Sequence, residues 1–158
     1  MPACLDCNHG WSDDEAHFRN VLTVAGEPNE VARELWNGKI KRSFEQGDGR
    51  RRFIDLYDQM QSIQTDSGER HKVFPANDPR FLRILRKIAR ALHHHHGLWT
   101  PVPDERVTAD VLRVAIPEEF SQAMPLLHCE PDIFQYQFEV FDQFADIPIS
   151  SVWLMDIF

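Results

Sequence analysis

The chain has 158 residues, of which 42% are hydrophobic and 27% charged, so its composition is that of a globular domain and excludes collagen-like, low-complexity and fully disordered chains. No apolar run approaches the roughly 18 residues that a membrane-spanning helix needs, so we expect no integral membrane protein. The formal net charge of −8 argues against a protein that holds nucleic-acid phosphates over its whole surface, because Lys and Arg carry that binding.

Two helices are predicted near the N-terminus. The first begins at Ser12, because Ser12 and Glu15 have the spacing of a capping box, and it ends at Gly26. The second covers Glu30–Phe44, where apolar residues recur at helical spacing. Gly38 lies inside this second helix and weakens it, because glycine loses the most backbone entropy on folding.

The middle of the chain is predicted to form a joint, a short helix and a hairpin. Residues 46–49 read Gln-Gly-Asp-Gly, a turn cluster that we interpret as the main joint of the chain. Helical spacing of apolar residues follows over Phe53–Met60. Two short strand patterns, 62–65 and 70–74, flank a turn at 66–68, which predicts a β-hairpin.

The strongest helix signal follows Asp78. Asp78 is suited to the N-cap, Pro79 to the first helical position and Gly97 to the C-terminal stop. The last turn of this helix is the run His93–His96, for which we expect a solvated helix end, with transition-metal binding as the alternative. The apolar residues expected on the inner side are Phe81, Ile84, Leu85, Ile88, Ala89 and Leu92.

The C-terminal part is predicted to pair two strands on the long helix. Residues 133–141 alternate between apolar and polar side chains, and 151–158 form a second strand pattern. Residues 98–132 show only a short strand pattern around 111–116. The predicted fold class is therefore α+β, with an N-terminal helical segment after a cysteine motif and then a helix-packed antiparallel sheet. We expect one compact unit with two parts, 1–45 and 46–158.

The cysteine motif comes before the first helix. Cys4 and Cys7 form a CxxC pair followed at once by Asn8 and His9, and these four residues are the candidate metal site. Three cysteines in a chain with no secretory leader favour reduced thiols or a metal over disulfides, and we expect a cytoplasmic protein. A structural zinc takes four ligands, so the pair needs further donors, from His9, from the segment around Cys129, or from a second chain in a homodimer. Two free thiols are the alternative.

The spacing Cys4-xx-Cys7-Asn8, followed by Ser12-xx-Glu15, resembles the C-terminal side of the HNH nuclease motif in a group of bacterial HNH-related proteins. The resemblance implies a zinc knuckle at Cys4 and Cys7 and places Asn8 at the metal-facing position. It also implies that the hairpin carrying the general-base His, together with the first knuckle, would lie upstream of residue 1. General-base catalysis contributes roughly 10²- to 10⁴-fold, so without that hairpin we expect no self-sufficient nuclease.

Negative charge is concentrated in the second half of the chain. Residues 91–158 hold 11 acidic and 2 basic residues, whereas residues 1–90 are near neutrality. This acidic block indicates either a solvated face or a surface that meets a basic partner. The candidate interaction residues are Asp104, Glu105, Asp110, Glu118, Glu119, Glu130 and Asp132.

Two classes of function follow from these observations. The favoured one is a non-catalytic protein-interaction module whose partner binds nucleic acid, such as a phage-type, anti-CRISPR-like inhibitor of a bacterial defence complex. Carboxylates suit that role because they compete for the Lys and Arg that hold phosphates. The alternative is a metal-dependent HNH-type DNA endonuclease, or a subunit of one, in which His17 or the His93–His96 run replaces the missing base.

Overall fold

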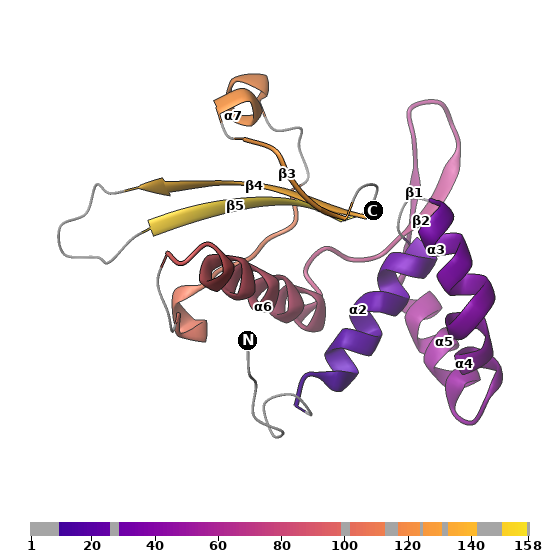
Figure 1. Ribbon diagram of the computed structural model, residues 1–158. Coiled ribbons are helices and arrows are strands. Elements are labelled where there is room, and N and C mark those ends of the chain that lie inside the picture. The colour runs from indigo at the N-terminus through magenta and orange to yellow at the C-terminus, as the bar shows by residue number, and fades with distance from the viewer. Residues whose placement is uncertain are drawn as a thin grey trace. The chain divides into compact units, whose positions relative to one another are not determined.

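The computed structural model describes residues 10–25, 29–98, 102–112, 117–123, 125–130, 133–141 and 150–157. These residues belong to two compact units, an N-terminal unit within Ala3–Phe81 and a C-terminal unit within Leu82–Ile157. Each unit combines helices with a small antiparallel sheet (Figure 1), so the predicted α+β class is confirmed. The joint predicted at 46–49 lies within the N-terminal unit, and the division of the chain between 45 and 46 stays a prediction.

The N-terminal unit begins with a series of helices. The Asn29 side chain accepts a 2.7 Å hydrogen bond from the Ala32 N–H and so caps the second of them. The predicted starts at Ser12 and Glu30 are confirmed. The helical elements are α2 (Ser12–Ala25), α3 (Glu30–Leu35), η1 (Trp36–Ile40), α4 (Lys41–Glu45) and α5 (Gly49–Gln59).

The helix predicted over residues 30–44 is interrupted by a π-helical turn. Within η1 the helix is wound more widely, and the Lys41 N–H donates to the Trp36 carbonyl five residues earlier. Gly38 lies in the middle of this turn. A π turn inserts one residue into the helix, so the side chains of α4 are rotated relative to those of α3.

Apolar side chains from these helices form the core of the N-terminal unit. Ile40 is 1% exposed, the least of the large core residues, because it lies where the π turn meets α4. The aromatic ring of Phe44 meets that of Phe53 at 5.2 Å, edge to face, which joins α4 to α5. The other buried apolar residues of this unit are Val21, Leu56 and Met60.

A hairpin follows α5. Strands β1 (Gln61–Gln64) and β2 (Arg70–Val73) pair antiparallel, so the predicted hairpin is confirmed. Apart from Val73, which is half-buried, the strand residues are exposed. The Nζ of Lys72 lies 4.6 Å from the ring centroid of Tyr57, a cation–π contact that ties the hairpin to α5.

The long helix α6 (Pro79–His95) starts in the N-terminal unit and continues through the C-terminal unit. Its predicted inner side is confirmed for Ile84, Leu85, Ala89 and Leu92, which are buried. The other two predicted residues, Phe81 and Ile88, are half-buried. The helix ends as predicted at Gly97, whose φ of 64° lies in the left-handed region that favours glycine. There the Gly97 and Leu98 N–H groups donate to the carbonyls of His94 and His93 at 3.0 and 3.2 Å.

The sheet of the C-terminal unit has three strands in the order β3 (Leu127–Glu130), β4 (Phe134–Phe141) and β5 (Ser150–Ile157), with both neighbouring pairs antiparallel. The predicted pairing of β4 with β5 is confirmed, and their register joins Phe134 to Ile157 and Phe141 to Ser150. Two short helices precede the sheet, η2 (Asp104–Arg106) and α7 (Glu118–Ala123).

The segment between α6 and β4 contains elements that the sequence did not predict. Helix α7 and strand β3 are both new. The strand pattern predicted around 111–116 is wrong for 111–112, which are irregular, and 113–116 lie outside the described residues. No helix in the described part of the chain is both long and apolar enough to cross a membrane.

Candidate functional site

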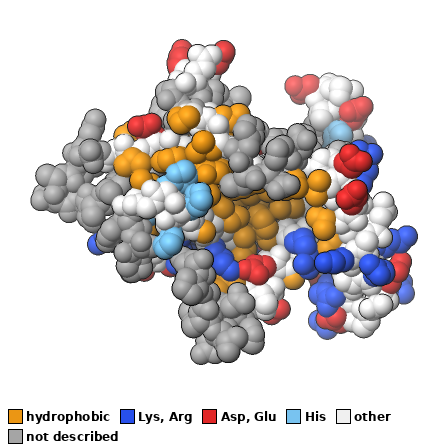
Figure 2. Space-filling model, in the orientation of Figure 1, with side chains coloured by type: hydrophobic (Ala, Val, Ile, Leu, Met, Phe, Trp, Pro, Cys, Tyr) orange, Lys and Arg blue, Asp and Glu red, His pale blue; other side chains and the backbone are white. Residues whose placement is uncertain are grey.

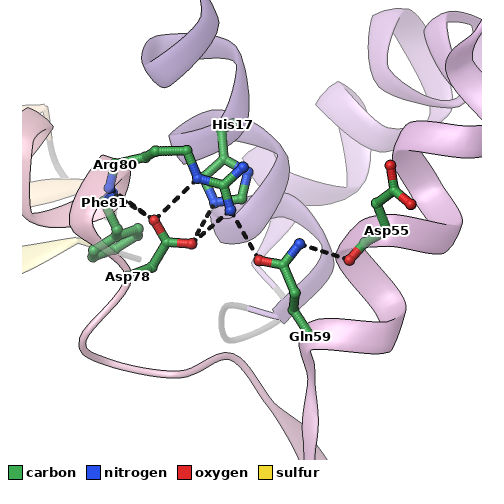
Figure 3. A network of polar contacts seen from close by, with 6 residues as sticks. All are labelled: His17, Asp55, Gln59, Asp78, Arg80 and Phe81. Atoms are coloured by element: carbon green, nitrogen blue, oxygen red, sulfur yellow. Dashed lines mark hydrogen bonds and ion pairs between the residues drawn. The ribbon is translucent and has the colours of Figure 1, made fainter.

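The carboxylate of Asp78 is the centre of a polar network in the N-terminal unit (Figure 3). Asp78 precedes α6 as predicted, and its Oδ1 accepts the backbone N–H of Arg80 at 2.8 Å and that of Phe81 at 3.3 Å. These bonds satisfy two of the N–H groups that a helix start leaves without partners. Asp78 is nevertheless only 7% exposed, so its charge needs further partners.

Arg80 supplies the positive charge of this network. Its Nη2 donates to the Asp78 Oδ2 at 2.7 Å and its Nε to the Asp78 Oδ1 at 3.2 Å, the forked geometry of a strong arginine–carboxylate pair. The same Nη2 donates to the Gln59 Oε1 at 2.9 Å, and the Gln59 amide donates to the Asp55 carbonyl at 2.7 Å. The network therefore ties the start of α6 to the end of α5.

His17 brings α2 into the same network. Its Nε2 lies 3.3 Å from the Asp78 Oδ2, and its ring meets that of Phe74 edge to face at 5.4 Å. Only 11% of the His17 side chain is exposed. Figure 3 shows the imidazole and the Arg80 guanidinium both directed at the Asp78 carboxylate.

The network perturbs the titration of both groups. Burial lowers the pKa of His17, and the neighbouring Arg80 lowers it further, so the imidazole is neutral at pH 7. Burial alone would raise the pKa of Asp78, but the hydrogen bonds and charge of Arg80 outweigh burial and lower that pKa to about 2. At neutral pH the network thus holds one anionic carboxylate, one guanidinium and one neutral imidazole.

This arrangement is suited to holding helices together. A general base must reach a water or a substrate proton, whereas the Nε2 of His17 faces Asp78 and most of its ring is covered. The carboxylate is already occupied by a guanidinium and two backbone N–H groups. The geometry therefore favours a structural role for His17 over the catalytic role considered from the sequence.

The predicted metal site lies outside the described residues. Cys4, Cys7, Asn8 and His9 belong to the part of the chain whose structure is not described, so the zinc prediction stays a prediction. Within the described ranges, no group of three or more His, Cys, Asp or Glu side chains is arranged to hold a metal ion.

Four of the acidic candidates of the C-terminal unit lie in two short helices, η2 and α7. Asp104 and Glu105 share η2, and Asp104 lies 3.8 Å from a guanidinium nitrogen of Arg86 and 3.6 Å from one of Arg90. Glu105 is exposed, as is Asp110. Asp104 is thus directed toward the basic side of α6, which makes it a weaker interaction candidate than its neighbour.

Helix α7 carries two more of these candidates. Glu118 and Glu119 lie in its first turn and are exposed, and the Gln122 amide donates to Glu118 Oε1 at 2.8 Å. Figure 2 shows red carboxylate side chains at the outer end of this helix. Of the remaining candidates, Glu130 lies in β3 and its side chain is not described, whereas Asp132 lies outside the described residues.

The histidine run at the end of α6 divides into two pairs. His94 and His95 are exposed, as expected for a solvated helix end. His93 is only 6% exposed, and His96 packs against Phe138 with ring centroids 4.4 Å apart. The expectation of a solvated run is therefore wrong for His93 and His96, because the strands β4 and β5 cover that side of the helix.

Sequence reasoning identified Asp78 as a cap and His17 as a histidine of interest but did not connect them. Arg80, for which the sequence indicated no role, pairs with Asp78 and Gln59. An arginine two residues after an aspartate N-cap is the local signal that could have indicated the pair. The aromatic partners of His93 and His96 come from strands some 40 to 60 residues away, so no local signal indicates them.

No protein-family model, curated protein or solved structure matches this chain.

Proposed function

We propose that the chain is a protein-interaction module that acts without catalysis, through carboxylates of its C-terminal unit, on a partner that binds nucleic acid. In its most specific form the proposal is an anti-CRISPR-like inhibitor built on an HNH-related scaffold. The observation that carries it is the exposure of Glu105, Asp110, Glu118 and Glu119, which leaves negative charge on the surface of this unit. Such carboxylates attract the Lys and Arg side chains with which a nucleic-acid-binding protein holds phosphates.

The surroundings of the histidines support binding over catalysis. The nuclease alternative needs a recruited imidazole, and the sequence offers His17 and the run at the end of α6. His17 is covered by Asp78 and Phe74, and His93 and His96 are packed against aromatic residues of the sheet. His17, His93 and His96 are thus engaged in packing.

The test is capture of partners from bacterial lysate by the whole chain. The decisive variant combines Glu105→Gln, Asp110→Asn, Glu118→Gln and Glu119→Gln, which removes charge while keeping side-chain size. We expect the wild-type chain to retain a stoichiometric, nucleic-acid-binding protein after nuclease treatment, and the variant to bind it about tenfold more weakly. Exposed charge pairs contribute roughly 0.2 to 1 kcal/mol each, so four of them account for a loss of that size.

A matched control variant separates the effect of the acidic surface on partner binding from the effect of net charge. Glu34, Glu45, Asp58 and Asp66 are exposed carboxylates of the N-terminal unit, and neutralising them changes the net charge by the same amount. This control variant should bind the partner as the wild type does. Equal binding by the wild type and the four-residue variant of the C-terminal unit would contradict the proposal, as would a partner that disappears on nuclease treatment.

A further inference from the structure

The side of α6 that faces the sheet in the C-terminal unit ends in two histidines. His93 and His96 are three residues apart and therefore share one face of the helix. Together with Tyr136, Phe138, Ser151 and Trp153 they form what we name the histidine cluster. Figure 2 shows pale-blue histidine side chains over the end of α6, next to orange apolar side chains.

His96 is held by aromatic side chains from both long strands. Its Nε2 forms a 2.9 Å hydrogen bond with the Tyr136 hydroxyl. Its ring lies 4.4 Å from that of Phe138 and 5.7 Å from that of Trp153, centroid to centroid. Phe138 and Trp153 are direct partners across β4 and β5 and stack at 4.5 Å, so His96 sits on an ordered aromatic platform.

His93 is the more deeply buried of the pair. Its Nδ1 lies 3.5 Å from the Ser151 hydroxyl oxygen, which also accepts the Trp153 indole N–H at 3.0 Å. Its other ring nitrogen, Nε2, is buried and has no hydrogen-bond partner among the described residues. A second proton on this ring would therefore place a full positive charge in a site with little to solvate it.

Strands β4 and β5 offer no carboxylate on this face to balance such a charge. Directly opposed residues of an antiparallel pair point to the same face, so Tyr136, Phe138, Ser151 and Trp153 share the face of the cluster. The carboxylates of β4 and β5, Glu139 and Asp156, alternate to the opposite face.

A further ionisable neighbour lies on α6 itself. The His95 ring lies 5.2 Å from that of His96, and a proton on either ring disfavours one on the other. The negative end of the helix dipole modestly favours a cation. The carbonyls of His93 and His94 already accept the N–H groups of Leu98 and Gly97, which weakens that effect, so burial dominates.

We propose that His93 and His96 form an acid-sensitive switch, in which the neutral imidazoles hold the last turn of α6 to β4 and β5 and their protonation releases it. This inference is independent of the proposed function. In support, burial lowers the pKa of His93 and that of His96, and His95 lowers that of His96 further. A histidine pKa below its ordinary 6.5 means that the cluster is at full strength above pH 6.5 and is weakened as the pH falls below it.

The test is hydrogen–deuterium exchange of the whole chain at pH 7.5 and 5.5, corrected for the intrinsic pH dependence of exchange. In the wild type, protection of the amides in β4, β5 and the last turn of α6 should fall at pH 5.5, by up to about tenfold for each histidine, because a released imidazole with the ordinary pKa of 6.5 is protonated about ten to one at that pH. The readout is local, so titration of His17 in the other unit does not affect it.

Variants identify the groups responsible. His93→Phe and His96→Phe keep a ring in the cluster without a titrating nitrogen, and each should reduce the acid-induced loss of protection. The matched control is His94→Gln with His95→Gln, two exposed positions of the same turn, which should preserve most of that loss. An acid-induced loss of protection that is as large in both Phe variants as in the wild type would overturn the switch. A wild type that keeps full protection at pH 5.5 would also overturn it.

A direct measurement covers the case in which a Phe variant does not fold. Nuclear magnetic resonance titration of the wild-type imidazoles should give pKa values below 6.5 for both His93 and His96. Values at or above 6.5 for both rings would overturn the proposal without any variant.

Discussion

Gly49→Ala is expected to lower the free energy of unfolding by about 3 kcal/mol or more. Gly49 is the first residue of α5 and is buried against the end of α4. A Cβ added there would overlap the Ser43 carbonyl oxygen and would lie 2.6 Å from the Phe44 Cα. These neighbours are backbone atoms that cannot rotate away, so α4 and α5 would have to separate.

Gly38→Ala is the matched control for this substitution. A Cβ at Gly38 would meet nothing within 4 Å, and its φ is not in the left-handed region. We expect this variant to be neutral or to stabilise by up to about 1 kcal/mol, because alanine loses less entropy in a helix than glycine. Urea unfolding followed by circular dichroism measures both variants. Equal stability of Gly49→Ala and Gly38→Ala would contradict the described packing of α4 on α5.

Asp78→Ala is the second substitution with a large expected effect, a loss of about 2 to 4 kcal/mol in the free energy of unfolding. It removes the cap of α6 and leaves the guanidinium of Arg80 and the imidazole of His17 without their shared carboxylate. Asp78→Asn should fall between the wild type and Asp78→Ala, since an amide oxygen can still accept the two backbone N–H groups.

Asn29→Ala is the control that isolates the capping contribution. Asn29 caps α3 through one hydrogen bond to the Ala32 N–H and lies outside the Asp78 network. Its loss is expected to cost about 1 kcal/mol. The difference between the losses in the free energy of unfolding caused by Asp78→Ala and by Asn29→Ala measures the contribution of the network to stability. Equal costs at the two positions would show that Asp78 acts as a cap alone.

The acid dependence of stability provides an independent check on Asp78. Its pKa is lowered from 3.8 to about 2, so the carboxylate contributes stability above pH 3.8 that is lost as the pH falls from 3.8 toward 2. A shift of this size corresponds to about 2 kcal/mol. Asp78→Ala should therefore lose less stability than the wild type in this window. His17, whose pKa is also lowered, contributes its own acid dependence below pH 6.5.

The sequence predicted the elements whose signals are local. Asp78 and Pro79 define the start of α6 and Gly97 its end, and both boundaries depend on backbone geometry within a few residues. The alternation over 133–141 predicts β4 because side chains on a strand point to opposite faces in turn.

The features that the sequence did not predict depend on distant partners or on weak local patterns. Strand β3 has only four residues and is defined by its pairing with β4, and its own pattern is too short to indicate a strand. His93 becomes buried, and His96 packs against aromatic rings, only because Tyr136 and Trp153 are brought to that face. The π turn around Gly38 likewise shifts a helix whose apolar spacing alone predicts an unbroken α-helix.

The candidate interaction surface was predicted as a list of acidic residues, and the structure distinguishes among them. Glu105, Asp110, Glu118 and Glu119 are exposed, whereas Asp104 is drawn toward Arg86 and Arg90. Sequence could not separate these cases, because the separation depends on how η2 lies against α6.

We propose that this chain acts by contact with a partner and does not cut DNA. The most direct measurement incubates the purified chain with supercoiled plasmid and with single-stranded DNA over a range of Mg²⁺ and Mn²⁺ concentrations. We predict that both substrates stay intact at every metal concentration. Metal-dependent nicking that disappears in Asn8→Ala and in His17→Ala variants, with both variants still folded, would contradict this proposal.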